Sequence, residues 1–428
     1  MADTFTFPKT FLWGAATSGH QVEGNNTHSD WWAWEQARRV KEPSGLACDH
    51  YRRFADDFDL ARSLGHTVHR FSIEWSRIEP AEGQWDEAAL AHYAEVVRAL
   101  RARQLEPVVT LHHFTTPQWL VTQGGWTNPK VVEAFERYVR RVSAALDGAV
   151  RYWITINEPM VYVRMHYVQG LGPPGGRNLR DALRVTEHLL RAHAAGYHAL
   201  HGAWRVGQPK PQVSIAHCVP SFVACRRWFP MDRLATWMTD RIFNIAVVEA
   251  LLEGRWRVPG VGRWRIPEAC QTLDFLGINY YSRQFMRWSP NRHGWLAENC
   301  DLAHHREVTE RSSLGWDVHA PAFAQALRLF AWTRLPILVT ENGTYMTDDR
   351  QRWRFIERNV QSMAGAMRHG APVVGYCYWS LLDNFEWAEG FGPRFGLIEV
   401  DYPTQQRRIR ESARRYAEIC RTNQIALT

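Results

Sequence analysis

Short apolar runs alternate with longer amphipathic stretches along almost the whole chain, and this alternation limits the possible folds more than any other feature. Apolar runs of about four to eight residues are typical of strands in a parallel sheet that is covered on its outer face. Between these runs, apolar residues recur every three or four positions, which is typical of helices. One example is Tyr51-Phe54-Phe58-Ala61-Leu64, a predicted helix that ends at Gly65. The predicted strands are 11–17, 68–73, 107–111, 152–158, 212–216, 273–281, 337–341 and 373–379.

Helices are predicted between these strands, at 51–64, 87–103, 130–146, 179–203, 232–252, 321–332, 352–368 and 409–420. Strands and helices in strict alternation, joined by right-handed crossovers, predict an α/β fold, a single (β/α)8 TIM barrel over residues 1–428. An open doubly wound sheet is the alternative, but no glycine-rich phosphate loop follows a strand. The active site of such a barrel lies at the C-terminal ends of its strands.

Two of the predicted strands end in a glutamate with a similar local sequence. Ile337-Leu338-Val339 leads to Thr-Glu341-Asn-Gly, and the run from Tyr152 leads to Thr-Ile-Asn-Glu158-Pro. A single glutamate at a strand end is usually a cap or an ion-pair partner. Two of them at the same rim form the carboxylate pair that glycoside hydrolysis requires, so the sequence predicts a glycosidase site.

Other polar and aromatic residues follow the same strand ends. They are Gln21 and Glu23 after the first strand, His112 and His113 after the third, Asn157 at the fourth, Asn279 and Tyr281 at the sixth, and Trp379 at the eighth. Because the C-terminal ends of barrel strands meet at one rim, we expect these side chains to gather there.

Composition excludes several other classes of protein. The net charge is +7, but the basic residues are scattered and no RNA-binding aromatic pattern accompanies them, so we expect no nucleic-acid partner. The start lacks a signal-peptide pattern, and no apolar run is long enough to span a membrane. Seven Cys without a C-x-x-C motif predict reduced thiols and a cytoplasmic location. The nearest pair, Cys218 and Cys225, has no histidine cluster around it, so we expect no metal site.

The chain resembles glycoside hydrolase family 1, the β-glucosidase family, from Phe11 to about Tyr402. FLWGAATSGHQVEG resembles the family's opening signature, and the segments around Glu158 and Glu341 resemble its acid/base and nucleophile motifs. WSLLDNFEWAEGF, with RFGL after it, resembles its sugar-binding block. The resemblance implies a β-glucosidase-type hydrolase without a cofactor or a metal.

The resemblance also implies a role for each matching residue. Glu341 would attack the anomeric carbon and form a glycosyl-enzyme, and Glu158 would protonate the leaving group and then activate water. A retaining enzyme needs these carboxyl groups about 5–5.5 Å apart, so their strands must face one another across the barrel mouth. The supporting residues would be Arg70, Asn157, Asn279 and Tyr281. The glycone-binding residues would be Gln21, His113, Asn157, Trp379, Glu386, Trp387 and Phe395.

Several positions depart from the family pattern or leave two interpretations open. Trp126 and Trp316 would line the aglycone side, although core packing is an equal alternative for each. Phe114 replaces the family's usual Trp, and Glu74 stands where Ser is usual. We expect Glu74 to form an ion pair with a nearby Arg.

The expected substrate is a terminal β-D-glucoside such as cellobiose or an aryl or alkyl glucoside, together with β-D-fucosides and β-D-galactosides. Glu386 would repel a 6-phosphate by its charge, which disfavours the phospho-glycosidase branch. Two alternatives stay open: a transglycosylase that uses the same carboxylates, and a catalytically silent sugar-binding homologue. The sequence does not fix the oligomeric state, and an oligomer is compatible with it.

Overall fold

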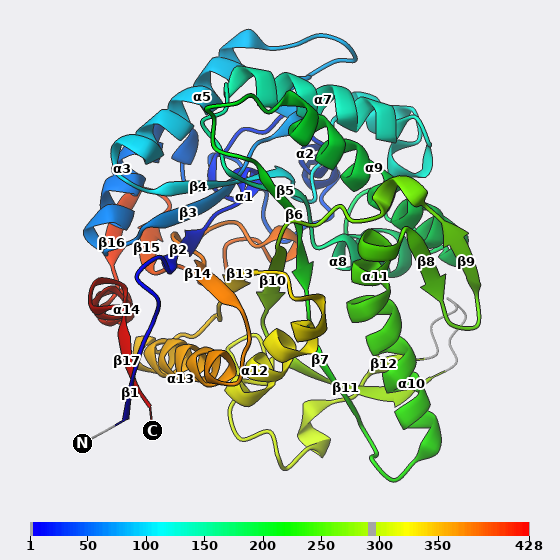
Figure 1. Cartoon of the computed structure of the whole chain (residues 1–428), viewed down its shortest axis with the longest axis vertical. Helices are drawn as coiled ribbons and strands as arrows, with labels where there is room; N and C mark the ends of the chain where they lie inside the picture. Colours follow the sequence, from blue (N-terminus) through cyan, green and yellow to red (C-terminus); the bar gives the residue numbers. More distant parts are fainter. Residues whose placement is uncertain (1–2, 290–296, 428) are drawn as a thin grey trace.

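The computed structural model describes residues 3–289 and 297–427. Eight parallel strands close into a barrel, and helices surround it (Figure 1). The (β/α)8 barrel predicted from the sequence is confirmed, and the open sheet is excluded. In chain order the barrel strands are β2 (Leu12–Ala16), β3 (Val68–Ser72), β4 (Glu106–His112), β5 (Tyr152–Asn157), β6 (Gln212–Cys218), β10 (Leu276–Tyr280), β13 (Ile337–Asn342) and β14 (Val373–Trp379).

The helices that cover the barrel match the predicted ones closely. They are α3 (His50–Ser63), α5 (Glu87–Ala102), α7 (Val131–Ala145), α9 (Leu179–Ala203), α10 (Pro230–Asp240), α11 (Ala246–Glu253), α12 (Ala320–Leu329), α13 (Asp349–Arg368) and α14 (Glu411–Thr422). The predicted helix 232–252 is divided, because the π-helix η3 (Arg241–Ile245) separates α10 from α11. The last helix starts two residues later than predicted, because Gln406–Ile409 forms the strand β16.

Short helical segments occupy the connections. They are α1 (Gly19–Val22), α2 (Asp30–Gln36), α4 (Trp75–Ile78), α6 (Gln118–Thr122), η1 (Gly125–Thr127), α8 (Pro159–Val163), the π-helix η2 (Arg164–Gln169), η4 (Pro267–Ala269), η5 (Leu302–His304), η6 (Ala331–Thr333) and η7 (Trp387–Glu389). Across residues 3–289 and 297–427, no helix is long and apolar enough to cross a membrane.

Side chains from many of the strands fill the barrel interior. Ala16, Val68, Val108, Ile154, Ala216, Leu338 and Cys377 form one buried cluster with Phe275, Trp379 and Phe395. A larger apolar layer packs between the strands and the helices outside them. The strands are thus buried on both faces, which is why they read as continuous apolar runs instead of alternating ones.

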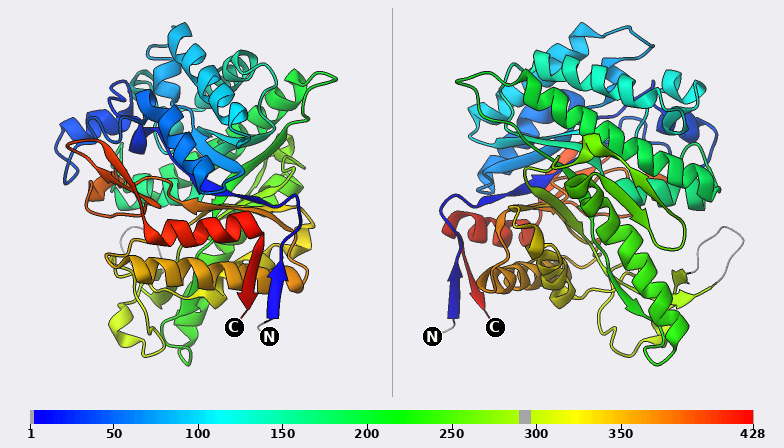
Figure 2. Two further views of the ribbon diagram at one scale, coloured as in Figure 1. Left: turned by 90° about the vertical axis from the view of Figure 1, so that its left-hand side faces the viewer. Right: turned by 45° about the vertical axis from the view of Figure 1, so that its right-hand side comes forward.

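Four small sheets lie outside the barrel, and the sequence predicted none of them. β1 (Asp3–Thr6) pairs with β17 (Gln424–Leu427), so the two ends of the described chain lie side by side (Figure 2). The other pairs are β8 (Arg255–Val258) with β9 (Gly262–Arg265), and β15 (Ile398–Asp401) with β16. A three-stranded sheet joins β7 (Ser221–Ala224), β11 (Arg283–Trp288) and β12 (Ala297–Asn299).

The structure corrects one prediction about the cysteines. Cys225 and Cys300 form a disulfide across the three-stranded sheet, so the prediction of seven reduced thiols is wrong for this pair. The two residues are 75 positions apart in the chain, and no local spacing marks them as partners. The other five cysteines are free, and four of these are buried.

Candidate active site

Both glutamates lie at the C-terminal rim of the barrel. Glu341 belongs to β13, and Glu158 follows β5 directly. On one side of the barrel, β6 and β10 lie between these two strands. Asn279, at the end of β10, spans this gap, since its Nδ2 donates to Glu158 Oε1 at 2.8 Å and to Asn157 Oδ1 at 3.2 Å. One amide therefore holds the Glu158 segment against the strand next to Glu341.

Glu341 is held by a cation and a hydroxyl group. The Arg70 guanidinium donates to one carboxylate oxygen, and the Tyr281 hydroxyl donates to the other. Arg70 is only 1% exposed, and its remaining donors reach Thr110 Oγ1 at 3.0 Å and Asn157 Oδ1 at 2.7 Å. These contacts fix the guanidinium on β3, so its charge stays directed at Glu341.

The two carboxyl groups differ in how strongly they hold a proton. Burial, and next the charge of Glu341, raise the pKa of Glu158 to about 8. Burial also raises the pKa of Glu341, but the Arg70 charge and the Tyr281 hydrogen bond oppose this rise. The pair therefore titrates in two steps, and the last proton resides on Glu158. A protonated and an ionised carboxyl group can thus coexist at neutral pH.

The backbone of Glu158 lies in the left-handed region, with φ 46° and ψ 60°. A residue with a side chain pays roughly 1–2 kcal/mol for this conformation, so its neighbours must enforce it. The N–H group of Glu158 donates to the Ala216 carbonyl at 2.7 Å, and Pro159 starts α8 immediately afterwards. This turn ends β5 sharply and places the Glu158 side chain beside Asn279.

A second group of polar residues lies between β2 and the loop that follows β14. Gln21 Nε2 donates to the Phe385 carbonyl at 2.8 Å, to Asn384 Oδ1 at 3.1 Å and to Glu386 Oε2 at 3.3 Å. Gln21 Oε1 is buried and has no hydrogen-bond partner, so it can accept one from a ligand. Burial, and then the charges of Glu341 and Glu158, raise the pKa of Glu386 to about 8.

His113 belongs to the same cluster. Its Nε2 is 3.3 Å from Asn157 Nδ2, and its ring lies nearly parallel to the rings of Trp379 and Trp387. The ring of His112 instead packs edge-on against Trp126. Burial lowers the pKa of His113 well below its usual value, so the ring is neutral. His113, and not His112, is therefore the histidine that contacts the polar cluster.

The two tryptophans predicted for the aglycone side have different surroundings. Trp126 is 0% exposed, and its Nε1 donates to Thr116 Oγ1 at 3.2 Å, so of the two interpretations left open for it, the structure supports core packing. Trp316 is 37% exposed and packs against Tyr281 and Phe395. Residue type alone did not distinguish a core tryptophan from a surface one.

The predicted ion pair of Glu74 is wrong. Its carboxylate accepts hydrogen bonds from Thr115 Oγ1 and Asn26 Nδ2, both at 2.7 Å, and from the His20 backbone at 2.9 Å. Neutral donors thus satisfy this buried carboxyl group, and its bond to the His20 backbone holds the segment that carries Gln21.

The sequence analysis missed three residues that position the site. Asn384 accepts from Gln21, Thr110 accepts from Arg70, and the Thr340 hydroxyl donates to Asn279 Oδ1 at 2.6 Å. Thr340 stands directly before Glu341, and Asn384 lies two residues before Glu386. That proximity to the predicted residues was the only available signal.

Arg352, on α13, joins the loops that follow β13 and β14. Its buried guanidinium donates to the carbonyls of Thr344 and Met346 in the first loop, at 3.2 and 2.9 Å. It also donates to those of Arg394 and Phe395 in the second loop, at 3.0 and 3.1 Å. One side chain therefore sets the spacing between the Glu341 loop and the Glu386 loop.

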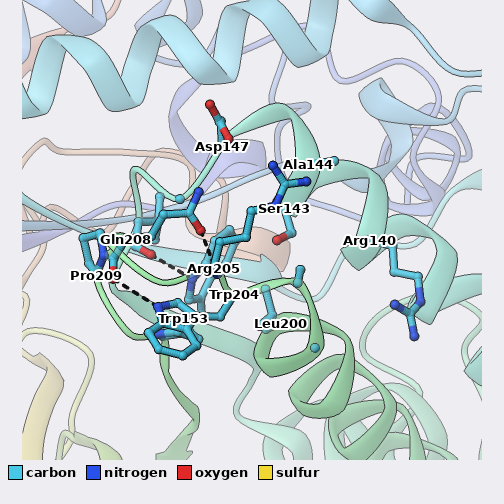
Figure 3. A pocket seen from close by; sticks show the side chains of 15 residues that line it. Arg140, Ser143, Ala144, Asp147, Trp153, Leu200, Trp204, Arg205, Gln208 and Pro209 are labelled. Atoms are coloured by element: carbon cyan, nitrogen blue, oxygen red, sulfur yellow. Dashed lines mark hydrogen bonds between the residues drawn. The ribbon is translucent and has the colours of Figure 1, made fainter.

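A hollow of about 400 Å³ lies near the opposite end of the barrel, where β5 begins (Figure 3). Its walls include Trp153, Trp204, Arg205, Gln208 and Asp147. Several polar groups of this hollow already bond to one another within the turn at residues 204–208. Trp204 Nε1 donates to the Gln208 carbonyl at 3.0 Å, and Gln208 Oε1 accepts from the Arg205 backbone at 3.1 Å. A single carboxylate is found among the lining residues, so this hollow offers no catalytic pair.

Comparison with known proteins identifies the family of the chain. The model of glycosyl hydrolase family 1 matches residues 3–425. The solved structure of a β-glycosidase from Pyrococcus horikoshii is 39% identical, with a TM-score of 0.92 over 99% of this chain and 96% of that one. The β-glucosidase of an Agrobacterium strain is 32% identical over 96% of this chain and 95% of its own, and the cytosolic β-glucosidase of Homo sapiens is 29% identical over 97% and 98%.

The fold and these comparisons define an O-glycosyl hydrolase of the β-glucosidase type. The chain belongs to glycosyl hydrolase family 1.

Proposed function

We propose that this enzyme is a retaining β-glycosidase that releases terminal β-D-glucosyl groups, and also β-D-fucosyl and β-D-galactosyl groups. Glu341 attacks the anomeric carbon, the bond to the aglycone oxygen breaks, and Glu158 gives its proton to that oxygen. Glu158 then removes a proton from water, which attacks the glycosyl-enzyme and frees Glu341. The observation that carries the proposal is the different surroundings of the two carboxyl groups. Glu341 contacts the Arg70 guanidinium and the Tyr281 hydroxyl, whereas Glu158 accepts from the neutral Asn279 amide.

The contacts around Glu341 support its proposed role as the nucleophile. An ionised carboxylate is required, and the Arg70 guanidinium favours the ionised form. Asn157 is oriented by Arg70 and lies beside Glu158, where its amide can bind the sugar 2-hydroxyl group. This hydrogen bond would strengthen in the transition state.

The cluster around Gln21 and Glu386 supports the proposed glycone pocket. Trp379 supplies an apolar floor, while His113, Gln21, Glu386 and Trp387 supply polar groups for the hydroxyls. Because the pKa of Glu386 is about 8, its repulsion of a 6-phosphate is weak when it is protonated and grows as the pH rises through 8.

A groove of about 490 Å³ supports an aglycone side next to Glu158. Its lining includes Arg164, Val168, Leu171, Arg177 and Met286. Arg164 and Val168 belong to η2, which continues the chain from Glu158 through α8, so the groove lies beside the segment that follows Glu158. Trp316 is the proposed aromatic contact at the rim, since it packs on Tyr281.

We also propose that residues 1–428 act as one catalytic domain in the cytoplasm. The barrel strands extend from Leu12 to Trp379, which supports the single domain. The human relative named as cytosolic supports the location.

The test is hydrolysis of matched nitrophenyl β-D-glucoside, β-D-galactoside, β-D-fucoside and 6-phospho-β-D-glucoside, with NMR detection of the first anomer released. A β-anomer, with the unphosphorylated sugars turned over fastest, is the expected result. An initial α-anomer would contradict the covalent role of Glu341. Binding of the sugars without turnover of any substrate would favour the silent homologue.

A further inference from the structure

The three-stranded sheet β12-β11-β7 carries a cluster of metal-ligating side chains that the hydrolytic mechanism does not use. Cys225, Cys300 and His305 each offer a ligand atom, and these atoms lie within 4.8 Å of one another. We propose that reduction of the Cys225–Cys300 disulfide produces a binding site for a thiophilic divalent cation, Zn²⁺ above all, with His305 as the third ligand.

The sheet fixes the positions of the two cysteines. The N–H group of Cys225 donates to the Met286 carbonyl at 2.8 Å, and that of Cys300 donates to the Phe285 carbonyl at 2.6 Å. Phe285 and Met286 are adjacent on the central strand β11. The outer strands β7 and β12 therefore place Cys225 and Cys300 next to each other, with their Cα atoms 6.1 Å apart. These backbone hydrogen bonds do not depend on the disulfide, and they preorganise the thiols after reduction.

His305 supplies a buried imidazole at the same place. It is 6% exposed, and its ring stacks on the Phe285 ring with 3.8 Å between centroids. Its Nε2 atom is buried without a hydrogen-bond partner among the described residues. A buried unpaired nitrogen is costly, and coordination of a cation would satisfy it.

A second imidazole, that of the preceding residue His304, lies beside Cys300 but outside this group of three. His304 Nδ1 lies 3.8 Å from Cys300 Sγ, at the end of the short helix η5. Cys300, His304 and His305 thus form a local C-x-x-x-H-H segment, and Cys225 comes from a distant strand. Two thiolates and two imidazoles make the tetrahedral donor set that Zn²⁺ prefers in structural sites.

The chemistry balances with an external reductant. A dithiol gives two electrons and two protons, the sulfur–sulfur bond of the protein breaks, and the dithiol itself becomes a disulfide. Binding of Zn²⁺ then releases the two thiol protons. At a Zn–S distance of about 2.3 Å, tetrahedral geometry separates the sulfurs by about 3.8 Å. A rotation about one Cα–Cβ bond supplies this separation while the backbone stays in place.

The location gives the cation a definite structural effect. Met286, Glu298 and Asn299 line the proposed aglycone groove, and they flank the cysteine pair in space or in sequence. A bound cation would join β7, β12 and the segment after η5 into one unit and hold this wall of the groove. The metal site itself does not depend on the proposed catalytic roles.

The experiment is a Co²⁺ titration of the whole enzyme after reduction with a phosphine and removal of the reductant under argon. The phosphine becomes its oxide, with oxygen from water. We expect one equivalent of Co²⁺ to produce thiolate charge-transfer absorption and tetrahedral d–d bands, which Zn²⁺ then removes. The unreduced enzyme is expected to show neither signal.

Matched variants separate this site from other thiols. The double variant Cys225→Ser/Cys300→Ser should lose both signals, and Cys270→Ser, which removes an exposed free thiol, should keep them. His305→Ala should weaken Co²⁺ binding about 10–100-fold. Nitrophenyl glucoside hydrolysis reports the folding of each variant. Reduced wild-type enzyme that absorbs no more than the double variant would overturn the proposal and leave a simple disulfide, as would unchanged binding by His305→Ala.

Discussion

The two glutamates lie at the same rim, yet their surroundings are opposite in kind. Glu341 sits inside the strand β13, where the register with β14 shifts, and contacts a guanidinium and a phenol. Glu158 sits in a left-handed turn after a strand, and its hydrogen bond comes from the neutral amide of Asn279. The contrast shows how one barrel can give identical side chains different proton affinities, by placing a fixed cation beside only one of them.

The largest expected effect is the loss of Glu341. Glu341→Gly removes the proposed nucleophile, so kcat for nitrophenyl β-D-glucoside should fall by about 10⁴-fold or more. Steady-state kinetics measures the loss, and retained binding of glucose, followed by calorimetry, serves as the control for folding. A Glu341→Gly variant that keeps a tenth of the normal rate would show that Glu341 is not the nucleophile.

The next effect should depend on the leaving group. Glu158→Ala removes the proposed general acid, so kcat on cellobiose should fall about 10²–10⁴-fold. The loss should be much smaller on a dinitrophenyl glucoside, whose leaving group needs no proton. Kinetics on both substrates gives the ratio, and equal losses on the two would contradict acid catalysis by Glu158.

The pH dependence of the wild-type enzyme tests the same residue without a mutation. The proposed general acid Glu158 must be protonated and its pKa is about 8, so kcat/KM should fall about tenfold per pH unit well above 8. A separate acid limb should appear at low pH, where the proposed nucleophile Glu341 gains a proton. A pH profile with nitrophenyl glucoside measures both limbs. Constant activity to pH 10 would contradict the prediction.

A smaller effect is expected from a change of the cation. Arg70→Lys loses the hydrogen bonds to Thr110 and Asn157, so the charge near Glu341 becomes less well placed. The pKa of Glu341 should rise, and the acid limb of kcat/KM should move up by about one pH unit. Arg77→Lys is the matched control, because Arg77 pairs with Glu23 instead. If the acid limb of kcat/KM moved equally in Arg70→Lys and Arg77→Lys, the shift would not come from the contact between Arg70 and Glu341.

The smallest effect concerns stability. The folded protein keeps the proton of Glu158 up to about pH 8, whereas the unfolded chain loses it near 4.5. The free energy of unfolding therefore falls as the pH rises between these values. Glu158→Gln has no ionisable group at this position and so avoids this loss of stability at high pH. Its Tm should therefore exceed that of the wild type by about 2 °C at pH 8.5 and by less at pH 5. Calorimetry at the two pH values measures the difference in Tm. A larger increase at pH 5 than at pH 8.5 would contradict a raised pKa of Glu158 in the folded protein.

The sequence predicted the barrel because its strands are buried on both faces. The runs at β5 and β13 contain little but apolar and β-branched residues, so strand assignment needed no knowledge of their neighbours. The three-stranded sheet was missed for the opposite reason. β11 reads Arg-Gln-Phe-Met-Arg-Trp, and its partner β7 lies about 60 residues earlier, so only the folded chain defines the pairing.

Within the site, residues with a local motif were predicted and residues defined by packing were not. Arg70 and Tyr281 do contact Glu341. The sequence left Trp126 undecided between core and entrance and misjudged Glu74, because the burial of one and the neutral donors around the other come from distant segments. The Cys225–Cys300 pair was missed for the same reason.

The buried guanidinium of Arg352 has a consequence for protein engineering. It holds four carbonyls, two in each of the loops that follow β13 and β14. Either loop, if grafted from a relative, should keep its shape only when the recipient helix α13 presents an arginine at the position of Arg352. The two loops and this helix should therefore be transferred together.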